Sequence, residues 1–250
     1  MSEILYQLND VDYSYAISKK QFTKALQGVN LAIGKGEALT VVGPSGCGKS
    51  TLLALLSGLI LPTGGEILFE GERLSGINRR AMLILQDYGL FPWKTVAENV
   101  ALGLILNRKE NNLTKREITA KVENILELLN ISNEKDKFPT QLSGGQRQRV
   151  AIGRALVMEP EVLLMDEPFA ALDAVTKAGL KDLIKDICRS RGLTLVFVTH
   201  NIEEAAAMGD RVVVFGREPG IIREIIDGNM DNLQERIKSA LGIGGADYEK

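Results

Sequence analysis

Histidine, cysteine and tryptophan are scarce in this sequence of 250 residues, which contains one histidine, two cysteines and one tryptophan. The single imidazole, His200, cannot build a metal site or a Ser-His-Asp triad unless other residues join it. Cys47 and Cys188 form no disulfide framework, and the opening segment MSEILYQLND has no signal-peptide pattern. We therefore expect a reduced, cytoplasmic setting for the protein.

A long hydrophobic run and an excess of charge of one sign are also missing. The most apolar stretch, LLALLSGLIL at 52–61, is interrupted by Ser57-Gly58, is stopped by Pro62 and is too short to span a bilayer. The formal net charge of −2 gives no overall attraction to nucleic acid or to an anionic membrane surface. We therefore expect no nucleic-acid partner and no membrane-spanning segment.

The composition, 45% hydrophobic and 25% charged, is that of an ordinary globular protein and fits one large domain or two intimate subdomains. Period-2 alternation over the first 40 residues, with a turn at 34–37, predicts antiparallel strands. In the rest of the sequence, short apolar strands alternate with helices, which predicts a parallel sheet covered on both faces. These strands are expected at 39–42, 81–86, 162–166, 193–199 and 211–215.

Several helical patterns lie together between about residues 95 and 158 and indicate a helical block inserted into an α/β core. In TKREITAKVENILELLN the apolar side chains share one face, and Thr114 with Glu117 is a plausible capping box. Gly153 lies inside another of these helices and should cost about 1 kcal/mol relative to alanine. The last residues, 228–250, are polar with a short amphipathic piece, and we expect a frayed surface segment.

A phosphate-binding loop is predicted at GPSGCGKST, residues 43–51, between the strand at 39–42 and a helix that begins near Lys49. Glycines let backbone N–H groups point at phosphate oxygens, and the helix N-terminus adds its dipole. Lys49 is expected to reach the β- and γ-phosphates of a nucleotide, and Ser50 to offer its hydroxyl to Mg²⁺. The nucleotide-binding residues predicted here are Gly43, Pro44, Ser45, Gly46, Cys47, Gly48, Lys49, Ser50 and Thr51, although the side chain of Cys47 has no required role.

Two carboxylates follow the apolar strand VLLMD at 162–166. Asp166 can hold the Mg²⁺ shell, and Glu167, which points differently, can polarise a water for in-line attack on the γ-phosphate. Such a pair met alone is often a solvated turn, but together with a phosphate loop it favours a catalytic site. These two motifs alone do not distinguish among kinases, helicases and many other nucleoside triphosphatases.

The segment LSGGQRQRVAIGRAL, residues 142–156, resembles the signature of ATP-binding-cassette (ABC) ATPases and precedes the strand at 162–166, as in that family. The resemblance spans residues 1–226. It implies an α/β fold with a P-loop NTPase core, in which a mostly parallel sheet has helices on both faces, joined by an N-terminal antiparallel β-subdomain and an inserted α-helical subdomain. The expected division is a core of 1–88 and 159–226, a helical signature subdomain at 89–158, and a C-terminal tail at 227–250.

The resemblance also implies that each ATP is shared between two subunits. Ser143, Gly144, Gly145 and Gln146 open the signature helix and would hold the γ-phosphate of a nucleotide bound by the other subunit's phosphate loop. Two copies would thus enclose two ATPs head to tail. In AALD at 170–173, Asp173 would contact the second subunit, and Ala170 stands where serine is common.

Further positions take roles from the same resemblance. Gln86 would approach Mg²⁺ and the attacking water, and His200 would contact the γ-phosphate, with Asn201 where aspartate is common. Tyr15 stands where an aromatic ring stacks on adenine, and Tyr13 is its rival for that place. The catalytic residues expected are therefore Glu167, His200 and Gln86, and the Mg²⁺ ligands are Ser50, Gln86 and Asp166.

The segment DYGLFPWKTVAENVALGL at 87–104 resembles ATPases of importers for nitrate, aliphatic sulfonates, taurine and bicarbonate. It implies that Leu90, Phe91, Pro92 and Trp93 form an apolar groove for a helix of a membrane permease, with subdomain core as the alternative. The expected protein is the ATPase subunit of a bacterial ABC importer, a homodimer that uses ATP and Mg²⁺ at the cytoplasmic face of the inner membrane and works indirectly with a solute-binding protein. The alternatives are the ATPase subunit of an exporter or a soluble ABC ATPase with no transport role.

Overall fold

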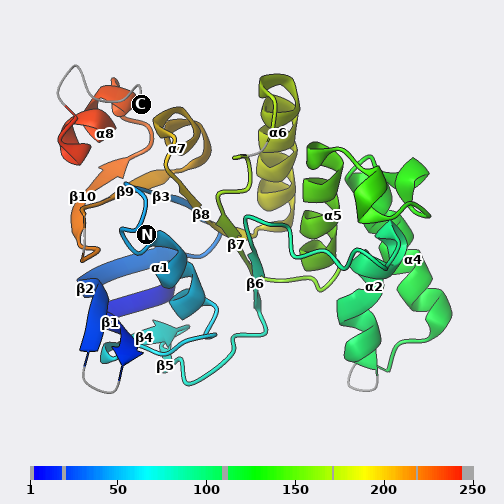
Figure 1. The fold of residues 1–250 in the computed structure, drawn as a ribbon, viewed down its shortest axis with the longest axis horizontal. Coiled ribbons are helices and arrows are strands. Elements are labelled where there is room, and N and C mark those ends of the chain that lie inside the picture. Colours follow the sequence, from blue (N-terminus) through cyan, green and yellow to red (C-terminus); the bar gives the residue numbers. More distant parts are fainter. Residues whose placement is uncertain (1–2, 19–20, 109–111, 171, 218, 244–250) are drawn as a thin grey trace.

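Two β-sheets and a set of helices that stands to one side of them make up the fold (Figure 1). The computed structural model describes residues 3–18, 21–108, 112–170, 172–217 and 219–243. Within these ranges, no helix combines the length and the apolar character needed to cross a bilayer.

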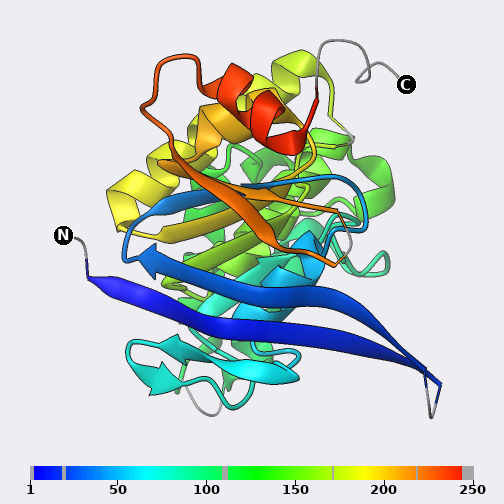
Figure 2. The ribbon, with the colours of Figure 1, turned by 90° about the vertical axis from the view of Figure 1, so that its left-hand side faces the viewer.

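The first sheet is antiparallel, with four strands in the order β2-β1-β4-β5. Its strands are β1 (Ile4–Ser18), β2 (Gln21–Gly34), β4 (Gly64–Phe69) and β5 (Glu72–Arg73). The first two form a long hairpin, paired from Ile4 opposite Gly34 to Ser18 opposite Gln21, which crosses the whole view in Figure 2. The antiparallel strands predicted from the alternating pattern are confirmed.

The second sheet has six strands in the order β10-β9-β3-β8-β7-β6. Its strands are β3 (Ala38–Val42), β6 (Ala81–Ile84), β7 (Val162–Asp166), β8 (Thr194–Thr199), β9 (Arg211–Phe215) and β10 (Ile222–Asp227). All pairs are parallel except β10 with β9. Every residue of β8 is buried, as expected where helices cover both faces of a parallel sheet. The parallel sheet is confirmed, and β10 is an addition that the sequence patterns do not indicate.

Helices cover both faces of the parallel sheet. Helix α1 (Lys49–Leu56) packs between the two sheets, where its leucines share a core with β1, β2, β7 and β8. Helices α6 (Ala174–Arg191) and α7 (Ile202–Met208) pack on the opposite face, against alternate residues of the same strands. The sheet is therefore the middle layer of the core, and the phosphate loop connects it to α1.

The helical lobe, on the right in Figure 1, contains α2 (Val96–Leu106), α4 (Lys115–Leu128) and α5 (Gly144–Leu156), with 3₁₀ turns at Ser132–Glu134 and Pro139–Gln141. The predicted capping box of α4 is present, with Thr114 Oγ1 accepting from the Glu117 N–H at 3.2 Å. A Cβ atom on Gly153 would lie 3.0 Å from Leu129 Cδ1 and 3.2 Å from Ile125 Cγ2. The glycine thus lets α4 and α5 pack closely, which offsets its low helix propensity.

The expectation of a frayed C-terminal tail is wrong for residues 233–243. Helix α8 (Leu233–Leu241) packs on α7 and β10, and Ile237 is fully buried in a cluster with Val42, Ile202 and Ile226. The polar residues of α8 face outward, which made the segment look like a surface tail. Its few apolar side chains lie on one face and cover the outer side of the sheet.

Replacing Ile237 with alanine should therefore destabilise the protein by about 2–5 kcal/mol, because the substitution leaves a cavity in a packed cluster. Thermal unfolding should show a decrease in Tm of several degrees. The matched control is Ile77→Ala, since Ile77 is 70% exposed and its truncation should leave Tm nearly unchanged. Equal Tm values for the two variants would show that α8 contributes nothing to stability.

Candidate functional site

Four strands of the parallel sheet end at the same edge and carry the predicted site residues. β3 leads into the phosphate loop at Gly43, β6 leads to Gln86, β7 ends at Asp166, and β8 is followed by His200. The register aligns these ends, with Val42 opposite Thr199 and Asp166 opposite Val198. Because parallel strands share their carboxyl ends, segments far apart in the sequence meet here.

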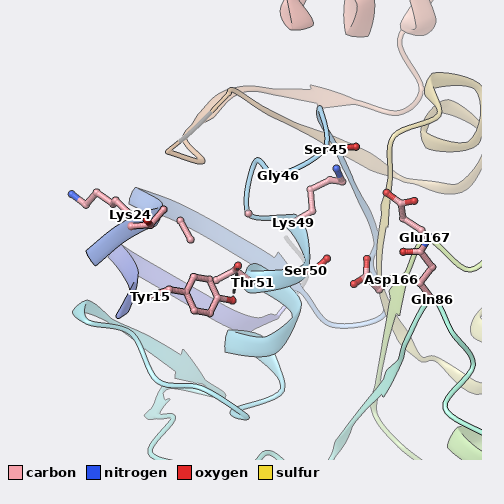
Figure 3. Close-up of a pocket in the computed structure, with 13 residues that line it drawn as sticks. Tyr15, Lys24, Ser45, Gly46, Lys49, Ser50, Thr51, Gln86, Asp166 and Glu167 are labelled. Atoms are coloured by element: carbon pink, nitrogen blue, oxygen red, sulfur yellow. Dashed lines mark hydrogen bonds between the residues drawn. The ribbon is translucent and has the colours of Figure 1, made fainter. Parts of the chain in front are cut away.

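A pocket of about 510 Å³ lies at this edge, and we call it the strand-end pocket. Figure 3 shows Lys49 and Ser50 at its centre, Asp166, Glu167 and Gln86 on one side, and Tyr15 on the other. The residues that line it are Tyr15, Thr23, Lys24, Ala25, Ser45, Gly46, Gly48, Lys49, Ser50, Thr51, Gln86, Asp166 and Glu167. Thr23, Lys24 and Ala25 were not predicted. They reach the pocket because Thr23 pairs across the hairpin with Tyr15, and a sequence alone does not reveal that register.

The ammonium group of Lys49 is held by the phosphate loop itself. Its Nζ donates to the backbone oxygens of Gly43 at 2.8 Å and Pro44 at 3.0 Å, and the residue is buried. Gly48 has φ +90, and a Cβ there would lie 2.6 Å from Leu26 Cδ2. Only glycine therefore fits where the loop packs against β2.

Asp166 lies beside Ser50, which donates a hydrogen bond to its carboxylate. Burial raises the pKa of the Asp166 carboxyl above its usual range, and the neighbouring Glu167 acts in the same direction. The hydrogen bond from Ser50 and the charge of Lys49 oppose this shift. The ionised form of Asp166 is thus disfavoured until a cation joins it.

Glu167 and His200 are in direct contact. The His200 Nδ1 lies 2.9 Å from Glu167 Oε2, and the imidazole side chain is 54% exposed. Glu167 has φ +43, a left-handed conformation that is unusual for a residue with a side chain. Its N–H donates to the Val198 carbonyl at 3.0 Å, which holds this conformation against β8. The lone histidine therefore has the glutamate as a partner, a contact that the sequence did not predict.

Tyr15 rather than Tyr13 faces the pocket. The Tyr15 hydroxyl lies 3.1 Å from Thr51 Oγ1 (Figure 3), whereas Tyr13 packs against the core between the sheets. The two rings touch edge to face, with centroids 4.9 Å apart. Tyr15 is thus an exposed ring supported from behind, which suits a stacking surface.

Gln86 is exposed and opens a turn that α5 holds in place. Arg154 of α5 donates to the carbonyl oxygens of Gly89 and, at 2.9 Å, Tyr88, while the Arg147 guanidinium lies 5.7 Å from the centroid of the Tyr88 ring. Burial lowers the pKa of Arg154. The sequence did not predict these contacts, because they depend on how the helical lobe packs against this turn.

Some predicted residues do not line the strand-end pocket. Gly43, Pro44 and Cys47 belong to the loop but do not line the pocket, and the buried Cys47 thiol lies close to Gly43. His200 does not line the pocket either and reaches it through its contact with Glu167. Ser143, Gly144, Gly145 and Gln146 lie on the helical lobe, where Ser143 caps α5 by accepting from the Gln146 N–H at 3.3 Å. Asp173 is exposed and caps α6 by accepting from the Thr176 N–H at 3.0 Å. Within one chain the signature residues and Asp173 therefore lie outside the pocket.

Replacing Asp166 with asparagine should stabilise the protein at neutral pH, because the raised pKa means that the folded state disfavours the ionised carboxylate. The variant's Tm should exceed that of the parent at pH 7. The gain should shrink as the pH falls, and it should vanish below the usual pKa of aspartate, where the carboxyl is protonated in both states. A variant Tm at or below the parent value at pH 7 would contradict the burial argument.

Comparisons with known proteins agree with this geometry. The model of the ABC transporter family matches residues 26–170. The chain is 43% identical over 212 residues to the aliphatic sulfonates import ATP-binding protein SsuB of Bacillus licheniformis, which covers 84% of this chain and 80% of that protein. It is 42% identical over 213 residues to the bicarbonate transport ATP-binding protein CmpC of Synechococcus elongatus. That match covers 85% of this chain but only 32% of CmpC, so the chain spans about a third of that relative's length.

The fold is also similar to that of solved structures. The ATP-binding cassette MJ0796, solved as a dimer in a post-hydrolysis state with ADP and Pi, has a TM-score of 0.80 and 32% identity, with 91% of this chain and 100% of that chain covered. The family model spans more than half of the sequence, and both relatives exceed a third in identity over most of it. The chain belongs to the ABC transporter family.

Proposed function

We propose that this chain is the ATP-binding and ATP-hydrolysing subunit of an ABC importer. The observation that carries the proposal is the meeting of Lys49, Ser50, Asp166 and Glu167 in the strand-end pocket. Lys49 supplies a positive charge for phosphates, and Ser50 and Asp166 supply oxygen ligands for a metal ion. Glu167 supplies a base that can accept a proton from water. The names of the relatives, bicarbonate transport and aliphatic sulfonates import proteins, favour import of a small anion.

Lys49 binds the β- and γ-phosphates in this proposal. Its ammonium group already points along the loop, where two carbonyl oxygens hold it. Phosphate oxygens would replace those carbonyls as its partners, so the lysine loses no hydrogen bond when the nucleotide binds. The loop's N–H groups and the N-terminus of α1 add further donors, and the exposed ring of Tyr15 would stack on the adenine.

The residues present fit a magnesium ion. The Ser50 hydroxyl and the Asp166 carboxylate are already hydrogen-bonded, and the Gln86 amide lines the same pocket. These are hard oxygen ligands, and Mg²⁺ in phosphate sites needs only a few of them from the protein. When bound, Mg²⁺ would neutralise charge on the phosphates. A cation there would also relieve the unfavourable burial of the Asp166 charge.

Glu167 is proposed as the base that accepts a proton from the attacking water. Its carboxylate lines the pocket one residue beyond Asp166 and touches His200. The imidazole can instead donate to the γ-phosphate, which would free Glu167 to accept from water. In this proposal His200 therefore senses the phosphate and positions Glu167, and Gln86 orients the water.

The Glu167→Gln variant should hydrolyse ATP about 10²- to 10⁴-fold more slowly, because an amide cannot act as the base. ATP binding should persist, and an ATP-bound dimer should accumulate in size-exclusion chromatography. The matched control is Glu203→Gln, which removes an exposed carboxylate on α7 and should leave turnover unchanged. Parental turnover in Glu167→Gln would refute its role as the base.

A second copy of the chain is proposed to complete each ATP site. Two groups of residues lie outside the pocket of their own chain, namely the signature residues Ser143 to Gln146 and Asp173. They are therefore available to contact the nucleotide bound by another copy of the chain. The similar cassette MJ0796 was solved as a dimer with ADP and Pi. We propose the head-to-tail arrangement, in which each signature helix meets the other subunit's phosphate loop.

A membrane permease is proposed to dock beside the helical lobe, through residues 87–104. Trp93 is 69% exposed, which argues against the alternative that it is subdomain core. Its ring contacts that of Phe91 edge to face, with the ring centroids 5.5 Å apart. Next to this segment an apolar groove of about 470 Å³ runs between α2 and α4, with Ala101, Ile118 and Val122 among its lining residues. Residues 90–93, which the sequence predicted to form the groove, do not line this one. The exposed ring of Trp93, supported by the half-buried Phe91, nevertheless suits contact with a helix of a partner.

The Trp93→Ala variant should lose permease assembly and transport-coupled ATPase activity but keep nucleotide binding, since Trp93 does not line the strand-end pocket. Co-purification with the permease and transport in membrane vesicles would measure this. The control is Met230→Ala, because Met230 is also exposed, at 49%, but precedes α8. Transport equal to that of the parent would exclude Trp93 from the interface.

The location proposed for the subunit follows from this partner. A permease in the inner membrane would hold the ATPase at the cytoplasmic face, and a solute-binding protein would deliver the anion to the permease from the other side. An exporter would use a similar cassette, and the features that favour import are the 87–104 segment and the names of the relatives. Co-purification with a permease would exclude a soluble ABC ATPase that has no transport role.

A further inference from the structure

A buried carboxylate lies directly behind His200. Glu204 of α7 is 4% exposed, and each of its oxygens has a partner. Its Oε1 accepts from Lys177 Nζ of α6 at 2.7 Å, and its Oε2 accepts from Thr199 Oγ1 at 2.7 Å. Glu204 thus joins three elements, namely α6, α7 and the last residue of β8.

The residues on both sides of His200 belong to the same network. The Thr199 hydroxyl, which donates to Glu204, accepts from the Asn201 N–H at 3.0 Å. Asn201 in turn accepts from the Glu204 N–H at 3.0 Å and caps α7. The turn that carries His200 is therefore closed on itself by hydrogen bonds, and Glu204 takes part in two of them.

The network also reaches the beginning of α6. Lys177 lies one helical turn after Asp173, and its N–H donates to the Asp173 carbonyl at 2.9 Å. The Lys177 side chain is only 24% exposed and that of Glu204 6%, so the pair holds a defined geometry against little competition from water. The position of the His200 turn is thus tied to the first turn of α6.

We propose that Glu204 is a positioning residue for His200, which fixes the imidazole against Glu167 and links it to the start of α6 through Lys177. The ring of His200 is more than half exposed, so burial of its own side chain does not hold it in place. Its contact with Glu167 and the hydrogen-bonded backbone on both sides do so. The proposal rests on the proposed function only where it assigns His200 a part in ATP hydrolysis.

The single histidine of this chain allows a direct measurement. In protein purified without a histidine tag, the Hδ2 and Hε1 NMR signals of an imidazole belong to His200 alone. Glu204→Gln cannot accept from both Lys177 and Thr199, and Thr199→Val removes only the hydroxyl. Both variants should shift or broaden the His200 signals in the nucleotide-free protein.

Thr194→Val is the matched control. Thr194 is on the same strand, is equally buried, and its hydroxyl likewise accepts from a backbone N–H, that of Gly36 at 2.9 Å. It stands at the opposite end of β8. In the Thr194→Val variant, the His200 signals and the ATP turnover should match those of the parent. Unchanged His200 signals in Thr199→Val and Glu204→Gln would overturn the proposal, whatever the turnover.

Steady-state kinetics then test whether the positioning matters for hydrolysis. Glu204→Gln should lower kcat by about 10- to 100-fold with little change in KM, the effect of a small misplacement of a reacting group. In a His200→Ala background the same substitution should change kcat by less than about twofold, because the residue that it positions is gone. If the kcat of the double variant fell by the product of the two single effects, Glu204 would act independently of His200. That result would overturn the proposal.

The two measurements separate this proposal from the proposed function. If the parent protein hydrolyses no ATP, the proposed function fails, and the NMR comparison still decides whether Glu204 positions His200. Should Glu204→Gln fold poorly, Thr199→Val preserves the Lys177 ion pair and tests the same turn. If the signals shift but turnover stays at the parental value in both variants, the proposed part in the reaction is wrong.

Discussion

The parallel register of β3, β8, β7 and β6 is the constraint on which the site depends. It places Val42, Thr199, Asp166 and Ile84 at one edge of the sheet, so the phosphate loop, the acidic pair, His200 and Gln86 all begin from the same line. A slip of one residue in any strand would turn its side chains to the opposite face. Such a slip is opposed by the close packing of side chains of different size on both faces of β3, β7 and β8, where nearly every residue is buried.

This edge has a cost in stability that the rest of the fold offsets. Asp166 is partly buried beside another carboxylate, Glu167 has a left-handed backbone, and Lys49 is satisfied only by its own loop. In the proposed function, a phosphate would become the partner of Lys49 and a cation would offset the buried charge of Asp166. The cores on both faces of the sheet hold the groups in position before that happens.

Local patterns predicted the strands, the helical insertion and the residues that bear chemistry, because apolar periodicity, glycine spacing and strand-end carboxylates are short-range signals. Helix α8 was missed because two buried residues, Leu233 and Ile237, leave a mostly polar sequence. Lys24 and Thr23 reach the pocket through hairpin register, and Arg154 through packing of the helical lobe. Glu204 was given no role from the sequence, because only the fold shows its partners on α6 and β8.

The helical lobe holds the segment between the strand-end pocket and the exposed Trp93 through several hydrogen bonds. Arg154 holds Tyr88 and Gly89, just after Gln86. Asn99 of α2 is fully buried, accepts from the Phe91 N–H at 2.8 Å and donates to the carbonyl oxygens of Phe91, Lys94 and Thr95. A segment bound in this way moves as part of the lobe rather than as a loose loop. A displacement of the lobe relative to the sheet would therefore carry Tyr88, Gly89 and Phe91 with it, and these residues lie between Gln86 and Trp93.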